Sequence, residues 1–164
     1  MYTIRQKHAS LEGLRVCIIG DIAHSRVAMS NIYGLLSMGA EVAVCGPSSM
    51  IPYRLEQLGV RVFSDIDEAL RFSDVINVLR IQLERDAGAN FPSVREYLNY
   101  FGITRRRLDK LGRDITILHP GPINRGVEIE SEVADGPYSV ILPQVTNGVA
   151  IRMAVLYLIG TSAE

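Results

Sequence analysis

Short apolar runs alternate along the chain with segments of helical periodicity. The apolar runs have the length and β-branched content of buried strands, and they lie at residues 15–20, 41–45, 61–63, 75–80 and 114–118. Helices are expected at residues 26–38, 53–58, 65–72, 94–101, 104–111 and 147–159. Strands that alternate with helices form a mainly parallel sheet covered on both faces. The pattern therefore predicts an α/β class fold, a three-layer Rossmann-like domain with a mainly parallel five-stranded sheet and helices on both faces.

Polar residues follow three of the predicted strands. Residues 21–26 follow the first strand, residues 80–85 end the fourth, and residues 119–125 follow the fifth. Ligands of open parallel sheets bind at the carboxyl ends of the strands. We therefore expect these three segments to converge at one edge of the sheet and to form a ligand site there.

The first two segments carry side chains suited to an anion. If strand geometry continues, Arg80 and Gln82 point to the same side, where a guanidinium fork and an amide can hold a carboxylate. Arg26 begins a predicted helix, where a cation opposes the helix dipole unless an anion lies nearby. The alternatives are ion pairs without a ligand, Arg26 with Asp21 and Arg80 with Asp21 or Glu84.

The turn after the fifth strand holds two prolines within three residues. Pro120 and Pro122 remove two backbone donors and stiffen the turn. The carbonyls of Pro120 and Gly121 then have few local partners and can accept hydrogen bonds from an amine or amide. A plain structural turn is the alternative. His119 is either a base or, as is more common after a core strand, a structural hydrogen-bonding group.

Composition narrows the classes of function. The 164 residues are 48% hydrophobic, enough for one domain with a core, and the net charge of −1 gives no general attraction to nucleic acid or to an acidic membrane. Cys17 and Cys45 lie in apolar runs, as buried reduced thiols of a cytoplasmic protein do. No cluster of Cys and His has metal-ligand spacing. No apolar run reaches the ~20 residues that a membrane helix needs, and the last predicted helix is about 12 residues long.

Two local features argue against other interpretations. A dinucleotide-binding turn would need glycine at the positions of Ile22 and Ser25, so an NAD-dependent enzyme is disfavoured. The three consecutive arginines at residues 105–107 are expected to form a solvated helix face rather than a nucleic-acid site.

Several stretches, taken in order, resemble one enzyme family. The chain reads Gly-Asp-Ile-Ala-His-Ser-Arg from residue 20, Leu-Arg-Ile-Gln-Leu-Glu-Arg from residue 79, His-Pro-Gly-Pro-Ile-Asn-Arg-Gly from residue 119 and Gln-Val-Thr-Asn-Gly-Val-Ala-Ile-Arg from residue 144. These stretches resemble the aspartate-binding domain of bacterial aspartate carbamoyltransferase catalytic chains over nearly the whole sequence. The second and third stretches separate it from ornithine carbamoyltransferases.

The resemblance implies an activity and roles for the residues above. The family transfers a carbamoyl group from carbamoyl phosphate to L-aspartate in pyrimidine biosynthesis, without a metal or organic cofactor. By resemblance, Arg26 and Arg80 bind the carboxylates of aspartate with help from Gln82. The turn of Pro120, Gly121 and Pro122 contacts the carbamoyl and amino groups. Residues 86–93 match a loop that closes over substrate, and Arg85 braces it.

The resemblance also implies a missing half. Residues 1–164 match the aspartate domain alone, while the half that binds carbamoyl phosphate, with its Ser-Thr-Arg-Thr loop and catalytic His, has no counterpart here. We therefore expect a cytoplasmic domain that is inactive alone and whose apolar last helix would pack on that half. The intact family forms homotrimers, with no nucleic acid or membrane partner. The alternative is a non-catalytic carbamoyltransferase-like scaffold module, which the retention of Arg26, Arg80 and Gln82 disfavours.

Overall fold

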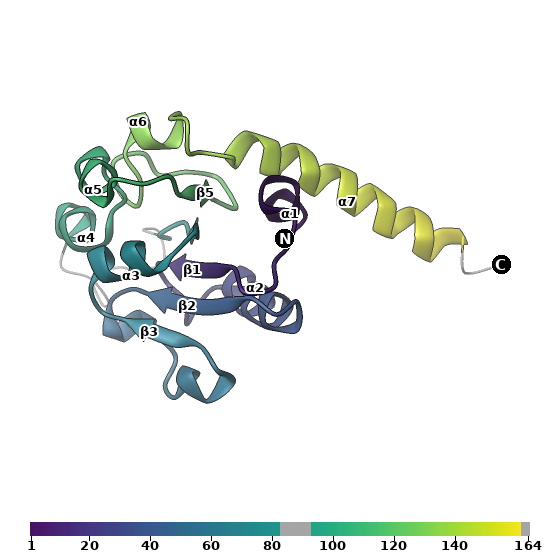
Figure 1. Ribbon diagram of the computed structural model, residues 1–164, viewed down its shortest axis with the longest axis horizontal. Coiled ribbons are helices and arrows are strands. Elements are labelled where there is room, and N and C mark those ends of the chain that lie inside the picture. The colour runs from purple at the N-terminus through teal and green to yellow at the C-terminus, as the bar shows by residue number, and fades with distance from the viewer. Residues whose placement is uncertain (83–92, 162–164) are drawn as a thin grey trace.

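A single five-stranded parallel sheet forms the centre of the computed structural model, which describes residues 1–82 and 93–161 (Figure 1). Its strands are β1 (Arg15–Ile19), β2 (Glu41–Cys45), β3 (Arg61–Phe63), β4 (Val75–Val78) and β5 (Thr116–Leu118). They lie in the order β3-β2-β1-β4-β5, and every neighbouring pair is parallel. The predicted fold class is confirmed, and β4 lies between β1 and β5 in the sheet.

Helices connect the strands as the alternating pattern predicts. They are α1 (Tyr2–His8), α2 (Arg26–Ser37), α3 (Ile66–Phe72), α4 (Val94–Phe101), α5 (Arg105–Leu111), α6 (Ser131–Ala134) and α7 (Ile141–Thr161), with 3-10 helices η1 (Ser48–Met50) and η2 (Leu55–Leu58). The helix expected at residues 53–58 is the shorter 3-10 helix η2. It begins at Leu55, because the backbone of the preceding residue, Arg54, has a left-handed conformation. The short helices α1 and α6 were not predicted.

Two hydrophobic cores cover the two faces of the sheet. Cys17 and Ile19 of β1 face a core shared with α3, α5 and α6. Val16 and Ile18 of the same strand face a second core, which α1 and α2 close. Alternate residues of one strand thus enter different cores, as strand geometry requires. Helices on both faces of the sheet confirm the three-layer prediction.

Side-chain caps fix where four of the helices begin. The hydroxyl of Ser25 accepts a hydrogen bond from the backbone N–H of Ala28 at 3.1 Å, which starts α2. Asp65, Ser93 and Thr104 cap α3, α4 and α5 in the same way. A cap satisfies one of the backbone donors that a helix start leaves unpaired. The start of α2 therefore lies directly beyond β1, at the edge where a ligand site was predicted.

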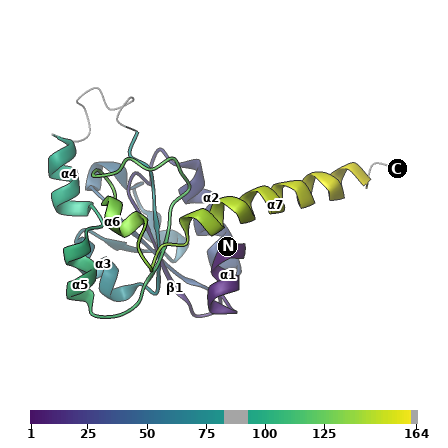
Figure 2. The same cartoon turned by 90° about the horizontal axis from the view of Figure 1, so that it is seen from above.

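The last helix is longer than predicted and extends away from the body of the domain (Figure 2). It begins at Ile141 rather than at residue 147, because Pro143 lies in the first turn, where its missing N–H does not interrupt the helix. Its 21 residues are long and apolar enough to cross a membrane by length and composition, which alone are weak evidence for a span. The expectation that no apolar segment reaches this length is therefore wrong.

Most large apolar side chains of α7 are exposed. Those with more than half of their surface accessible are Leu142, Val145, Val149, Met153, Leu156, Tyr157, Leu158 and Ile159. Near its start α7 lies beside α1, where the Asn147 amide donates to Thr3 Oγ1 at 3.0 Å and to Gln6 Oε1 at 2.6 Å. In the described structure the last helix thus presents an apolar surface to solvent.

Both cysteines are buried in the sheet and are free thiols. Cys17 lies opposite Ala43 across the β1–β2 pair, and Cys45 lies opposite Ile19. Burial raises the pKa of the Cys45 thiol to about 12, so this side chain is a protonated core residue at neutral pH. The predicted burial of the two thiols is confirmed.

Candidate functional site

A pocket of about 210 Å³ opens at the carboxyl ends of β1, β4 and β5. It is lined by Asp21, His24, Ser25, Val27, Leu79, Arg80, Gln82, Pro120, Gly121 and Pro122. Eight of these ten residues come from the three polar segments that were predicted to converge, and Val27 and Leu79 are directly adjacent to those segments. Because the three strands are neighbours in a parallel sheet, their following turns meet at one edge, and the predicted convergence is confirmed.

Arg80 and Gln82 both line the pocket, although not for the predicted reason. β4 ends at Val78, so strand alternation does not orient these two side chains. Ile81 orients the segment instead, since its side chain is 3% exposed and packs with Tyr97 and Val127 in a small separate core. With Ile81 buried, the residues on either side are left half-buried at the pocket wall.

Arg26 stands apart from the other predicted site residues. It is the first residue of α2 and is exposed, while its neighbours Ser25 and Val27 line the pocket. The pocket thus brings together five of the six predicted site residues, and a role for Arg26 stays a prediction.

Asp21 has a partner other than the arginines considered from sequence. Its carboxylate accepts hydrogen bonds from the backbone N–H of His24 at 3.1 Å and lies 3.0 Å from Nδ1 of the same residue. Among the described residues, the ion pair of Asp21 with Arg26 does not form. Glu84, the other partner considered for Arg80, lies outside the described residues, as do Arg85 and most of the predicted loop at residues 86–93.

His119 is a structural residue at the start of the turn whose residues Pro120, Gly121 and Pro122 line the pocket. Its side chain is fully buried, Nδ1 accepts a hydrogen bond from the N–H of Gly121 at 2.9 Å, and Nε2 lies 3.1 Å from Oε1 of Glu128. Nδ1 is therefore the acceptor and Nε2 carries the proton toward the carboxylate. Both ring nitrogens are engaged, which favours the structural interpretation over a base. Gly121 has φ +69°, a conformation that favours glycine, and its bond to Pro122 is cis.

A second set of contacts joins this turn to the wall that carries Arg80. The backbone N–H of Asn124 donates to Glu128 Oε1 at 2.6 Å, and the Asn124 side-chain amide donates to the carbonyl oxygen of Ile81 at 2.7 Å. Sequence reasoning missed Asn124 and Glu128. The stretch from residue 119 contains Asn124, but no local pattern reveals a bond to a residue 43 positions away.

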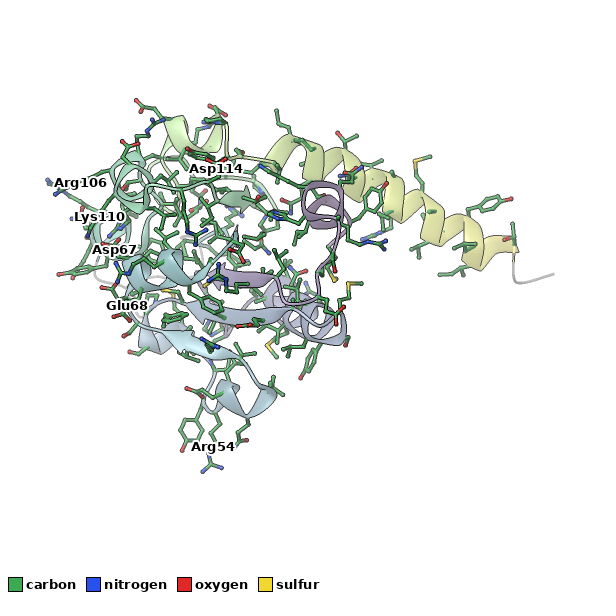
Figure 3. All side chains as sticks on the ribbon, in the orientation of Figure 1. Arg54, Asp67, Glu68, Arg106, Lys110 and Asp114 are labelled. Atoms are coloured by element: carbon green, nitrogen blue, oxygen red, sulfur yellow. The ribbon has the colours of Figure 1, made fainter. Side chains whose placement is uncertain are left out.

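A larger hollow of about 430 Å³ lies between α3, α4 and α5 rather than at the strand ends. Figure 3 shows Asp67, Arg106 and Lys110 together on this flank. Asp67 is already paired, at 3.2 Å from Arg107 Nε and 3.0 Å from Lys110 Nζ. The hydrogen bond from Lys110 is the main reason why the pKa of Asp67 is lowered. Paired charges of both signs make this hollow a weaker candidate than the pocket at the sheet edge.

The arginine run beside that hollow is only partly solvated, so the predicted solvated face is wrong at Arg107. Its side chain is 18% exposed, and its guanidinium donates to the carbonyls of Asn99 at 2.7 Å and Gly102 at 2.8 Å. Helix ends leave carbonyls without partners inside the helix. Arg107 thus closes the end of α4, whereas Arg105 forms an exposed pair with Asp109.

Metal ligands do not gather in the part of the chain that the structure describes, where no group of three or more His, Cys, Asp or Glu side chains lies close enough to hold an ion. The pocket itself offers hydrogen-bond donors and acceptors. Arg80 and Gln82 supply N–H donors on one wall, and the turn around Gly121 faces them. Such a pocket suits a small anion that also carries hydrogen-bond donors.

The fold and this pocket define a Rossmann-like α/β domain with its candidate ligand site at the carboxyl edge of a parallel sheet. The chain belongs to the aspartate/ornithine carbamoyltransferase family, because the family model described as the Asp/Orn binding domain matches residues 12–159. The resemblance seen in the sequence is thereby confirmed.

Curated relatives and solved structures agree with this family. Two proteins named aspartate carbamoyltransferase catalytic subunit, from Gemmatimonas aurantiaca and Halothermothrix orenii, are 58% and 60% identical over 159 residues, or 97% of this chain. The chain spans about half the length of the curated relatives it matches, 50% and 51% respectively. The solved ornithine carbamoyltransferase from Pyrococcus furiosus has a TM-score of 0.77 at 25% identity, covering 94% of this chain and 52% of that one. The catalytic subunit of M. jannaschii aspartate transcarbamoylase has a TM-score of 0.76 at 28% identity, with the same two coverages.

Proposed function

We propose that this chain is the aspartate-binding domain of an aspartate carbamoyltransferase and is inactive alone. It would hold L-aspartate while another domain holds carbamoyl phosphate. The observation that carries the proposal is the single pocket in which Arg80 and Gln82 face the turn of Pro120, Gly121 and Pro122. The proposal includes the other expectations of the resemblance: pyrimidine biosynthesis, homotrimeric assembly, a cytoplasmic location and no metal or organic cofactor.

The two walls of the pocket match the two ends of aspartate. A carboxylate is an acceptor, and the guanidinium of Arg80 and the NH2 group of the Gln82 amide are matching donors. The amino group carries N–H donors, and the backbone carbonyls of Pro120 and Gly121 are acceptors. An aspartate gripped by the first wall would therefore direct its nitrogen toward the second. Arg26 is proposed to neutralise the second carboxylate, for which its exposed side chain must turn toward the pocket.

Positioning is the contribution that this domain would make to the reaction. The lone pair of the aspartate nitrogen attacks the carbonyl carbon of carbamoyl phosphate and the new C–N bond forms. The C–O bond to phosphate breaks with the electron pair leaving on phosphate, and the departing phosphate takes the proton that the nitrogen loses. A nitrogen held in line avoids the entropy of a bimolecular encounter, which is worth up to about 7–11 kcal/mol in well-oriented systems. Carbonyl acceptors orient the nitrogen and stabilise the positive charge that develops on it.

The experiment is a calorimetric titration of the chain with succinate, a dicarboxylate without the reactive amine. We expect saturable binding that R80A weakens by at least about tenfold, since a charge-assisted pair is worth about 1.5–3 kcal/mol. R106A is the matched control, because Arg106 lines the hollow between α3, α4 and α5 and its loss changes the net charge equally. Equal binding by R80A and R106A would contradict the proposal.

A second measurement tests the inactivity of the isolated domain. The chain alone should form no carbamoyl aspartate above background when supplied with aspartate and carbamoyl phosphate. Addition of the amino-terminal half of the Gemmatimonas aurantiaca relative should restore turnover. Turnover by the chain alone that R80A abolishes would show that the domain is competent and would overturn this part of the proposal.

A further inference from the structure

We propose that Asn124 is a positioning residue that holds the two walls of the pocket at a fixed separation. This inference deepens the proposed function and rests on it. Asn124 does not line the pocket and is half-buried behind it. It acts through the backbone of the segment that carries Arg80 and Gln82, and through the turn that carries Gly121.

One hydrogen bond of Asn124 runs to the wall that carries Arg80, and the other runs to the buried Glu128, which contacts His119 of the turn. The Asn124 side-chain amide donates to the carbonyl of Ile81 at 2.7 Å, and its backbone N–H donates to Glu128 Oε1 at 2.6 Å. Ile81 lies between Arg80 and Gln82 in sequence, so a shift of its carbonyl moves the backbone on which both side chains stand. The bond from Asn124 thus fixes both predicted carboxylate ligands at once.

The other end of this connection is anchored in the core. Glu128 is fully buried, and its Oε1 lies 3.1 Å from His119 Nε2 while it accepts from Asn124. His119 is also fully buried and accepts from the N–H of Gly121 at 2.9 Å. The backbone N–H of His119 donates to Oε1 of Gln144, a residue of α7. A continuous series of hydrogen bonds therefore leads from Gly121, through two buried side chains, to Asn124.

This arrangement meets a geometric need of the site. In the described part of the chain no backbone hydrogen bond joins residues 79–82 to residues 119–122, so the separation of these two segments depends on side chains. A small displacement of one wall would misplace an aspartate nitrogen relative to the carbonyls, and catalytic geometry tolerates only about 0.5 Å. The Asn124 side chain supplies a direct hydrogen bond from the turn to the wall that carries Arg80. We therefore infer that Asn124 positions the two walls as well as stabilising the fold.

The test compares N124A with N147A in succinate titrations of the full chain. Each variant removes one half-buried amide donor, and Asn147 bonds α1 rather than the pocket. We expect N124A to weaken succinate binding about three- to tenfold, the effect of one lost hydrogen bond, and N147A to leave it within about twofold. Backbone amide resonances of Arg80 and Gln82 should shift in N124A without ligand and stay in place in N147A.

The outcomes separate this inference from the function beneath it. If the wild-type chain binds succinate, R80A does not, and N124A binds as tightly as N147A, Asn124 has no positioning role although the proposed function stands. If both variants weaken binding equally, the effect is general destabilisation and the inference is wrong. If the wild-type chain does not bind succinate, the proposed function and the inference fail together. Thermal unfolding of each variant shows that the comparison is made on folded protein.

Discussion

Replacement of Arg107 by alanine is expected to destabilise the domain far more than the same change at Arg105. The guanidinium of Arg107 donates to the carbonyls of Asn99 and Gly102 at the end of α4. Its Nε also lies 3.2 Å from a carboxylate oxygen of Asp67 on α3. A cation at this end of a helix satisfies unpaired carbonyls and complements the helix dipole. One side chain thus joins α4, α5 and α3.

The magnitude follows from the geometry. A hydrogen bond that involves a charged group contributes about 1.5–3 kcal/mol, and the bonds to Asn99 and Gly102 are short, at 2.7 and 2.8 Å. Water replaces part of this bonding in the variant, so we expect a loss of about 2–3 kcal/mol rather than the sum. Arg105 and its partner Asp109 are 54% and 60% exposed, and such helical pairs contribute about 0.3–0.5 kcal/mol.

Urea and thermal unfolding followed by circular dichroism measure this difference. For a domain of this size a loss of 1 kcal/mol lowers Tm by about 2–4 °C, so R107A should lower Tm by about 5–10 °C and R105A by about 1 °C. R107K keeps the charge but lacks the planar fork that reaches several carbonyls, and it should fall between the two. Losses of equal size for R105A and R107A would refute this account of Arg107.

Two further predictions concern buried or paired groups. Arg15 donates to the Asp74 carboxylate at 2.6 and 3.0 Å, and this bonding lowers the pKa of Asp74. The stability that this pairing gives is fully present above the unfolded pKa of about 4 and is lost as pH falls through the lower folded pKa. The urea midpoint of the wild type should therefore fall more steeply than that of D74N between about pH 5 and 2. Parallel curves for the two proteins would contradict the pairing. At His119, the amide oxygen of H119N can take the place of Nδ1 and accept from the Gly121 N–H. The longer side chain of H119Q instead takes the place of Nε2 and keeps only the contact with Glu128. H119Q should therefore weaken succinate binding more than H119N. Equal affinities in the two titrations would show that the bond to Gly121 does not position the turn.

Local sequence patterns defined most elements of the fold but not every boundary. The bounds of β2 and β3 were predicted correctly, because each is an apolar run closed by turn or capping residues. The end of β4 was misplaced because Leu79 and Ile81 are as apolar as strand residues. Ile81 is buried by a contact with Tyr97 rather than by pairing in the sheet. The start of α7 was misplaced because a proline reads as a helix breaker except in the first turn.

The candidate site was predictable as a meeting of segments but not as a network. Topology alone requires the turns after neighbouring parallel strands to meet, so the grouping of Arg80 with Gly121 followed from the strand order. The support behind the pocket depends on Asn124 and Glu128, whose partners are set by tertiary structure. The arginine run shows the same limit, since only the fold distinguishes the half-buried Arg107 from its solvated neighbours.

The pocket is built from turns, and the strands beneath it supply only their ends. Its lining side chains come from residues 21–27 without Arg26, from residues 79–82 and from residues 120–122, and Leu79 of this lining also packs in the core that α1 and α2 close. A new ligand preference can therefore arise by changes at half-buried lining residues such as Gln82, with less effect on the free energy of unfolding than a change at the buried Leu79. The Pyrococcus furiosus relative, which is named for ornithine, has a similar fold with a TM-score of 0.77. Exchange of single half-buried lining side chains between such relatives is thus a practical route to an altered ligand preference.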